Sequence, residues 1–206
     1  MTHGSTAELL SLHAVRLQGF VDSADAAARF GLDPAVVDDH LLDAEAVGWV
    51  SRSEFDGTRG WSLTEAGRRA NEAALARELD EVGARRDVEH VHDDFLPVNA
   101  LLADAVTRWQ LRPAPHDPLA ANTHEDAAWD AAVLGDLARV GEALGGLAAR
   151  LAARLPRFEG YDDRFAGALA RADGDPAWVA GTGVDSCHRV WFELHEDLIA
   201  TLGRTR

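Results

Sequence analysis

The sequence contains no lysine, only one cysteine and no long apolar run. All 20 basic residues are arginine, against 35 acidic residues, and the formal net charge is −15. The single cysteine, Cys187, excludes an intrachain disulfide. No apolar run approaches the roughly 20 residues of a membrane-spanning helix, and residues 1–8 lack the basic and apolar segments of a secretory signal. Together these absences predict a cytoplasmic protein.

The negative charge limits the partners that we expect. A protein this acidic repels a phosphate backbone unless its arginines gather on one face, and it has little attraction for an anionic membrane. We therefore expect no membrane partner. Hydrophobic residues still make up 47% of the 206 residues, which is enough to build the core of one or two globular domains.

Motifs for several classes of enzyme are missing. There is no Walker A or GxGxxG loop for a nucleotide, no HExxH zinc motif, and Ser186 does not lie in a GxSxG context. We therefore expect no catalytic residue, no cofactor and no metal.

Histidines and carboxylates nevertheless gather in three stretches, which leaves a second interpretation open. The stretches contain His90, His92, Asp93 and Asp94; His116, His124 and Glu125; and His188, Glu193, His195 and Glu196. A helical bundle that brought three or more of these groups to one point would make a carboxylate–histidine site. The favoured alternative is polar surface and helix caps, with Cys187 as a buried, inert thiol rather than an activated one.

Helical spacing and capping residues predict three short helices at the start of the chain. Ser23 and Asp33 are the expected N-caps of the second and third helices, and Pro34 suits a first helical position. The predicted helices cover residues 8–18, 24–30 and 34–47. Gly31 and Gly48 end the second and third helices.

The pattern then changes to two short strands. They cover residues 49–55 and 60–63, and the turn residues of 56–60 join them as a hairpin. Thr64 is the expected N-cap of a long helix that follows. The order is thus three helices, a hairpin and a helix.

The segment LLDAEAVGWVSRSEFDGTRGWSLTEAGRR, residues 41–69, carries a resemblance to a known family. It is similar to the third helix, wing and following helix of bacterial winged-helix regulators of the MarR, PadR and ArsR type, and the resemblance extends over residues 8–80. It implies a winged helix-turn-helix domain in residues 1–82 and a bacterial transcriptional regulator. Regulators of this type act as dimers, so the resemblance also implies a homodimer.

The remainder of the chain, residues 83–206, is predicted to be an α-helical bundle for dimerisation or effector sensing. The fold class is therefore mainly α, a winged helix-turn-helix domain followed by a helical bundle. A long alanine- and leucine-rich helix is expected to begin after a capping box at Thr123 and Asp126, and Asp185 is the expected N-cap of the last helix.

Double-stranded DNA is the partner that the resemblance implies. The helix 33–47 would enter the major groove and the wing 52–62 would touch the backbone. The candidate DNA-binding residues are His40, Arg52, Arg59, Arg68 and Arg69. However, the helix 33–47 contains five acidic residues and no arginine, and residues 1–80 hold 7 Arg against 14 Asp and Glu. The alternative is a winged helix that is reused as a protein-interaction module, without DNA binding.

The C-terminal part is rich in aromatic residues and arginines, which suggests a pocket for a small anionic effector. The candidate ligand-binding residues are Arg108, Trp109, Trp129, His188, Trp191 and His195. Aromatic side chains at helical spacing are also the usual content of a helical core, so this alternative stays open.

A second resemblance is confined to VDSCHRVWFELHEDLIATLGRTR, residues 184–206. It is similar to segments that follow or accompany phosphoenolpyruvate-utilising dikinase-like enzymes in actinobacteria. The catalytic and nucleotide-binding domains of those enzymes have no counterpart in the sequence. This resemblance implies a non-DNA-binding accessory protein linked to such an enzyme, with a protein partner instead of DNA.

Overall fold

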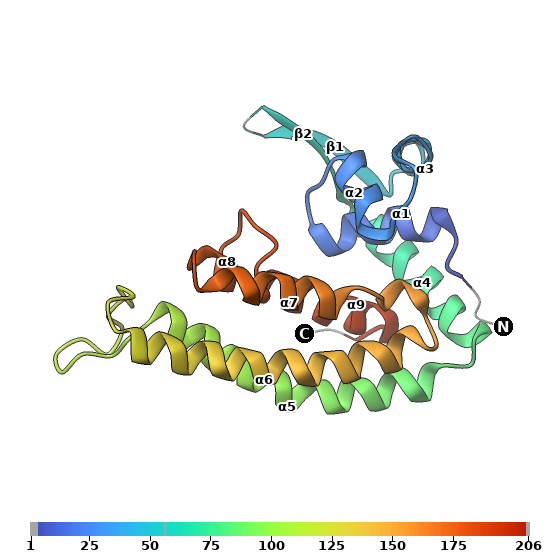
Figure 1. Ribbon diagram of the computed structural model, residues 1–206. Coiled ribbons are helices and arrows are strands. Elements are labelled where there is room, and N and C mark those ends of the chain that lie inside the picture. Colours follow the sequence, from blue (N-terminus) through green and yellow to red (C-terminus); the bar gives the residue numbers. More distant parts are fainter. Residues whose placement is uncertain (1–3, 56, 205–206) are drawn as a thin grey trace. The chain divides into compact units, whose positions relative to one another are not determined.

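A computed structural model describes residues 4–55 and 57–204, which are mainly helical with one two-stranded antiparallel sheet (Figure 1). The chain divides into two compact units. Unit 1 comprises the described residues of 1–86, together with 154–157 and those from 196 onward, and unit 2 comprises 87–153 and 158–195. The sequence placed one boundary after residue 82. The structure has a boundary close to it, but two later segments return to unit 1, because Arg157 and Asp197 pair with charges there.

Unit 1 begins with three helices, each preceded by a side-chain cap. Thr6, Asp22 and Asp33 accept a hydrogen bond from a backbone N–H of the first turn, which satisfies donors that a helix start leaves free. The cap of the second helix is thus Asp22 and not Ser23, because the Asp22 carboxylate reaches the Asp25 N–H at 2.8 Å. The helices are α1 (Ala7–Gln18), α2 (Ser23–Phe30) and α3 (Pro34–Ala46).

The hairpin follows α3 and consists of β1 (Val50–Phe55) and β2 (Thr58–Leu63). The two strands are antiparallel, and Arg52 lies opposite Trp61. Trp61 also pairs with Val21 through two backbone hydrogen bonds, and its indole N–H donates to Ser23 Oγ at 2.9 Å. These bonds fix the base of the hairpin against the start of α2.

Helix α4 (Glu65–Glu81) begins at a tightly packed junction. The Thr64 hydroxyl accepts from the Gly67 N–H at 3.0 Å and donates to the Gly48 carbonyl at 2.6 Å. A Cβ atom on Gly67 would lie 1.8 Å from the Trp49 carbonyl oxygen, so only glycine fits there. Two residues of the T-E-A-G sequence are therefore explained: Thr64 caps α4, and Gly67 allows the close approach of the Trp49 backbone.

The interior of unit 1 has an apolar part built by α1, α2, α3 and the hairpin. Its buried members come from each of these elements, so the three helices and the hairpin share one core. The central residues are Ala14, Val15, Ala26, Ala27, Val37, Leu41, Val50 and Trp61. Leu9 of α1 and Leu75 of α4 pack with Ala200, which brings the C-terminal part of helix α9 into the same unit.

Unit 2 is built from long helices. The elements of residues 85–202 are α5 (Arg85–Gln110), α6 (Ala127–Ala152), the short 3₁₀ turn η1 (Pro156–Phe158), α7 (Tyr161–Ala172), α8 (Ala177–Ala180) and α9 (Cys187–Leu202). Asp126 is itself the N-cap of α6. Asp185 does not cap α9, because its carboxylate accepts two hydrogen bonds from Arg164. Ser186 takes the capping role, and its hydroxyl accepts from the Arg189 N–H at 3.3 Å.

Stacked aromatic side chains form the centre of unit 2. The rings of Phe95 and Trp191 are stacked with centroids 4.8 Å apart, and Phe165 meets Trp191 edge-on. The indole N–H of Trp191 donates to Asn99 Oδ1 at 2.8 Å, so its one polar atom is satisfied. Aliphatic residues of α6 such as Leu137 and Leu144 are fully buried. None of the helices in the described residues is both long enough and apolar enough to cross a membrane.

Candidate functional site

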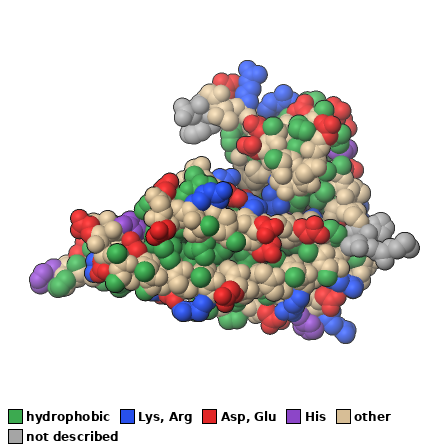
Figure 2. Space-filling view, in the orientation of Figure 1, with side chains coloured by type: hydrophobic (Ala, Val, Ile, Leu, Met, Phe, Trp, Pro, Cys, Tyr) green, Lys and Arg blue, Asp and Glu red, His purple; other side chains and the backbone are tan. Residues whose placement is uncertain are grey.

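The outer face of α3 carries apolar and acidic side chains together. Val36 and Leu42 of α3 are each 41% exposed, and Val47, which directly follows the helix, is 61% exposed. The acidic residues exposed beside them are Asp38, Asp39 and Asp43. In Figure 2, acidic and apolar atoms lie side by side over the part of unit 1 that holds α3, and arginine atoms lie over the hairpin.

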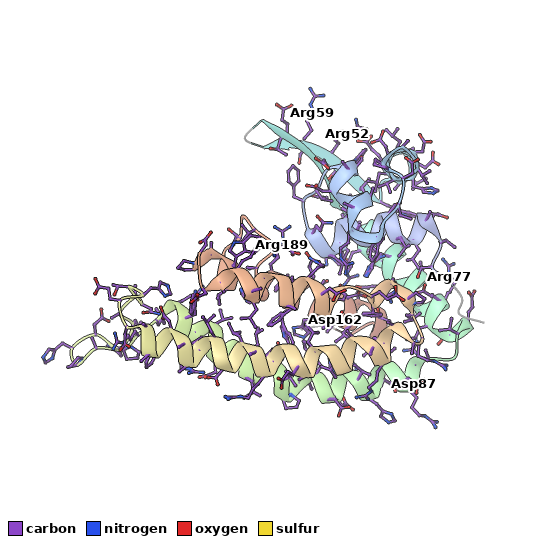
Figure 3. The ribbon with its side chains drawn as sticks, viewed as in Figure 1. Arg52, Arg59, Arg77, Asp87, Asp162 and Arg189 are labelled. Atoms are coloured by element: carbon purple, nitrogen blue, oxygen red, sulfur yellow. The ribbon has the colours of Figure 1, made fainter. Side chains whose placement is uncertain are left out.

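Two of the predicted DNA-binding arginines lie on the hairpin. Arg52 donates to Glu45 at 3.0 Å, and its guanidinium lies 4.3 Å from the centre of the Trp61 ring. The Arg59 side chain, 79% exposed, donates to Glu54 at 3.2 Å (Figure 3). Both therefore lie on the hairpin as predicted, and both have a carboxylate partner.

The other predicted residues lie on α4 and α3. Arg69 pairs with Glu65 at 3.1 Å, and Arg68 lies 3.8 Å from Glu196. His40 is partly buried and lines a groove beside α3. Exposed pairs of this kind contribute roughly 0–1 kcal/mol each, so a phosphate can displace a carboxylate from them. The pairing therefore does not decide against DNA; the acidic face of α3 is the stronger obstacle.

A groove of about 440 Å³ lies between α1, α3 and α4. Its floor is apolar and comes from all three helices and from Trp49, which precedes β1. The apolar residues that line it are Leu9, Leu12, Leu41, Ala44, Val47, Trp49, Ala70 and Ala74. A hollow of about 200 Å³ adjoins it and shares Thr6, Leu9, Ala74 and Arg77.

Unpaired charges lie along the groove. Glu8 and Asp43 line the larger hollow, Glu81 lines the smaller one, and Arg77 of α4 lines both (Figure 3). All four are exposed, and none pairs with another charged side chain in the part of the chain that the structure describes. The groove therefore combines an apolar floor with a rim on which carboxylates outnumber guanidinium groups.

A cluster of paired charges lies inside unit 1. Asp197 of α9 is fully buried and accepts hydrogen bonds from Arg157, which lies in η1, and from His13 Nε2 at 3.0 Å. The Arg157 guanidinium also donates to Glu78 of α4 at 3.0 Å and to the Thr201 hydroxyl at 2.7 Å. We call His13, Glu78, Arg157, Asp197 and Thr201 the buried ionic cluster. It connects α1, α4, η1 and α9.

The electrostatics of this cluster favour the charged forms. Burial alone would raise the pKa of Asp197, but Arg157 and His13 hold it well below its usual range. Burial likewise opposes the charge of Arg157, but Asp197 and Glu78 raise its pKa. Because every partner is a side chain of the same unit, the cluster joins elements and offers no open position for a substrate.

Five of the six predicted ligand-binding residues fall into two groups of unit 2, and the sixth, His188, lies at the start of α9. Arg108, Trp109 and Trp129 lie together near the end of α5, where the Trp129 indole donates to the Arg108 carbonyl at 2.9 Å. Trp191 and His195 instead contact Phe95, in the middle of α5. The structure therefore does not bring all six predicted residues to one point, and an effector site stays a prediction.

Individual side chains of the predicted set have structural partners. The Trp109 indole donates to the Pro176 carbonyl at 3.1 Å, and Arg108 pairs with Asp104 and Asp136. Burial lowers the pKa of His188, which favours its neutral form.

His124 and Cys187 each have a structural environment in the described part of the chain. His124 Nδ1 lies 2.9 Å from Asp130, and this pair fixes the loop before α6. Burial raises the pKa of the Cys187 thiol to about 12, so the thiolate that a nucleophile needs is suppressed. No group of three or more histidine, cysteine, aspartate or glutamate side chains suited to a metal occurs within residues 4–55 and 57–204.

Sequence reasoning missed the groove and the buried ionic cluster. One signal was available for the cluster: His13 and Asp197 each interrupt an apolar stretch, LLSLHAVRL and HEDLIATL, at a position that faces the core. A charged residue at a core position needs a partner, although the sequence does not say which one. No signal of this kind exists for the groove, because a hollow depends on how three helices pack.

No protein-family model, curated protein or solved structure matches this chain.

Proposed function

We propose that unit 1 is a winged-helix domain that binds another protein, and that the chain is an accessory protein. The order α1–α2–α3, hairpin, α4 supports the winged-helix assignment, with β1–β2 as the wing. The observation that carries the protein-binding function is the outer face of α3. Val36 and Leu42 are exposed there next to three aspartates and no arginine, and the exposed Val47 directly follows the helix.

The charge of α3 argues against DNA as its partner. In a winged-helix protein this helix enters the major groove, between two phosphate backbones. There Asp38, Asp39 and Asp43 would meet phosphates, with no arginine or lysine on α3 to offset the repulsion. Removal of exposed aliphatic side chains from water is favourable, and contact with a protein surface achieves it.

DNA binding by a dimeric transcriptional regulator is the second candidate function, because Arg52 and Arg59 lie on the wing. In this alternative the wing arginines contact phosphates, and a homodimer places two α3 helices about one DNA turn apart. Light scattering of the purified full chain measures the oligomeric state that this alternative requires.

Anisotropy of a fluorescent random duplex, titrated with the full chain at about 50 and 200 mM salt, separates the two functions. We expect no binding at either salt concentration. Binding at the lower concentration that falls by orders of magnitude at the higher one would contradict the proposal. Loss of that binding in an Arg52→Gln, Arg59→Gln variant would then assign it to the wing.

The resemblance of residues 184–206 gives a first protein partner to test, a phosphoenolpyruvate-utilising dikinase-like enzyme. The proposal predicts a complex of the two purified proteins in size-exclusion chromatography. A Val47→Arg variant should lose the complex, because it puts a charge among the exposed apolar side chains. An Ala132→Arg variant makes the same charge change at an exposed position of α6 and should retain it.

A further inference from the structure

We infer that the groove between α1, α3 and α4 is the docking site of unit 1, and that it receives a basic amphipathic helix of the partner. This inference rests on the proposed function, that unit 1 binds protein. It adds where the partner binds and which chemistry the partner presents.

The shape of the groove suits a helix. The two hollows share Ala74 and Arg77, so they form one trough along α4, from Ala70 to Glu81. At the rise of an α-helix these residues are about 16 Å apart, which corresponds to about three turns of a partner helix. Ala70 and Ala74 are small, so a second helix can approach α4 closely at the middle of the trough.

The apolar floor supplies the contacts. Leu9, Leu12 and Trp49 line the larger hollow, and Val47 lies at its edge with 61% of its surface exposed. A helix that binds in this way inserts apolar residues at spacings of three and four, in the helix-in-groove mode of peptide recognition. Val47 is then covered by the partner, which accounts for an exposed valine on this edge.

The charges on the rim favour an occupant with a positive charge. Glu8, Asp43 and Glu81 are exposed and unpaired among the described residues, and Arg77 is the one unpaired arginine that lines the trough there. Carboxylates thus exceed arginines by three to one, so cationic residues on the flanks of the partner helix are favoured. A single acidic residue on that helix would pair with Arg77. The net charge of −15 also accelerates the encounter with a basic segment.

The test uses the full chain and a defined probe. The probe is a fluorescent 16-residue helical peptide of leucine and lysine with apolar residues at spacings of three and four, and the control peptide has glutamate in place of lysine. Anisotropy should show saturable binding of the lysine peptide and none of the glutamate peptide. Amide shifts in two-dimensional NMR should change at Ala70, Ala74 and Val47.

Substitutions then separate the groove from general attraction between charges. Ala74→Arg fills the trough, and it should weaken binding about tenfold or more, because apolar contacts cannot form around a buried charge. The exposed Ala132→Arg variant should bind as the unmodified chain does. Glu8→Gln with Asp43→Asn should weaken binding several-fold and reduce its dependence on salt. Asp38→Asn with Asp39→Asn removes the same charge from α3 residues that do not line the groove, and should leave affinity nearly unchanged.

Three results would overturn the inference: no binding of the lysine peptide, equal binding by the Ala74→Arg variant, or equal losses in the two acid-to-amide pairs. Circular dichroism of each variant shows whether it has folded. If Ala74→Arg does not fold, the NMR map and the two acid-to-amide pairs still decide. The proposed function has its own outcome, since salt-dependent DNA binding would contradict it whatever the peptide does.

Discussion

Different interactions stabilise the interiors of the two units. The centre of unit 2 consists of stacked aromatic and aliphatic side chains, including Phe95 and Trp191, and the buried carboxylate of Glu193 pairs with Arg164, which reaches the surface. Unit 1 has an apolar core around α1–α3 and, in addition, the buried ionic cluster of Arg157 and Asp197. Apolar packing is non-directional and tolerates exchange, whereas a buried ion pair stabilises only when both partners are present. The difference predicts which kinds of change each unit tolerates.

Removal of the central cation should have the largest effect. Arg157→Met removes the guanidinium that pairs with both Asp197 and Glu78 inside unit 1, and we expect a loss of about 3–5 kcal/mol in the free energy of unfolding. Urea denaturation measures it. The control, Arg139→Met, removes an exposed partner of Asp136 and should cost less than about 1 kcal/mol. Equal losses in Arg157→Met and Arg139→Met would show that the buried ionic cluster contributes no more than an exposed ion pair.

A cavity in unit 2 should lower the free energy of unfolding slightly less than the loss of Arg157 does. Leu144 is fully buried, and Leu144→Ala should lower the free energy of unfolding by about 3 kcal/mol, within the usual range for such cavities. The loss should be the same at pH 5 and pH 7, because no charge is involved. Leu101→Ala, at a side chain that is 61% exposed, is the matched control and should change stability little. A strongly pH-dependent loss at Leu144 would show that the interior of unit 2 depends on titrating groups.

Acid should affect unit 1 through Asp197. Its pKa is lowered in the folded chain, so its contribution to stability is present above the unfolded value of about 4 and is lost as the pH falls below it. One such group steepens the fall by up to about 1.4 kcal/mol per pH unit. Asp197→Asn should therefore show a shallower decline between pH 4 and pH 2.5, measured by urea denaturation. Asp104→Asn, at an exposed position on α5, should keep the slope of the unmodified chain. An unchanged slope in Asp197→Asn would contradict the assignment.

The smallest expected effect is a gain in unit 2. Gly145 lies inside α6, and an added Cβ meets no heavy atom within 4 Å. Gly145→Ala should raise the free energy of unfolding by roughly 0.5–1 kcal/mol, because alanine loses less backbone freedom on folding. Thermal denaturation tests it. A loss would show that the backbone of α6 needs glycine at this point.

Local features of unit 1 were predictable, because they depend on neighbouring residues. The three helices, the hairpin and the cap at Thr64 follow from short-range patterns, and each lies within a few residues of its predicted position. Errors arose where two side chains competed for a role. Asp22 caps α2 in place of Ser23, and Asp185 binds Arg164 instead of capping α9. Both choices depend on which side chain reaches its partner.

The groove and the buried ionic cluster lay beyond sequence reasoning for a different reason. Glu78, Arg157 and Asp197 are separated by tens of residues in the chain, and only packing brings them together. The sequence does not indicate that Arg157 is buried, because nothing distinguishes it from the other arginines among the 20. For the predicted DNA contacts, the positions on the hairpin and α4 followed from the sequence, but the carboxylate partner of each arginine did not.

The return of residues 196 onward to unit 1 has a consequence for how the chain folds during synthesis. Domains generally fold as they emerge from the ribosome, beginning at the N-terminus. Here α1 and α4 are made early, but Asp197 and Thr201, which complete the interior beside them, emerge more than 100 residues later. Until then His13 and Arg157 lack the carboxylate of Asp197, so the first-made unit is completed last. A stalled chain that ends before residue 196 should therefore expose an incomplete unit 1 to proteases, even though its first 86 residues are all present.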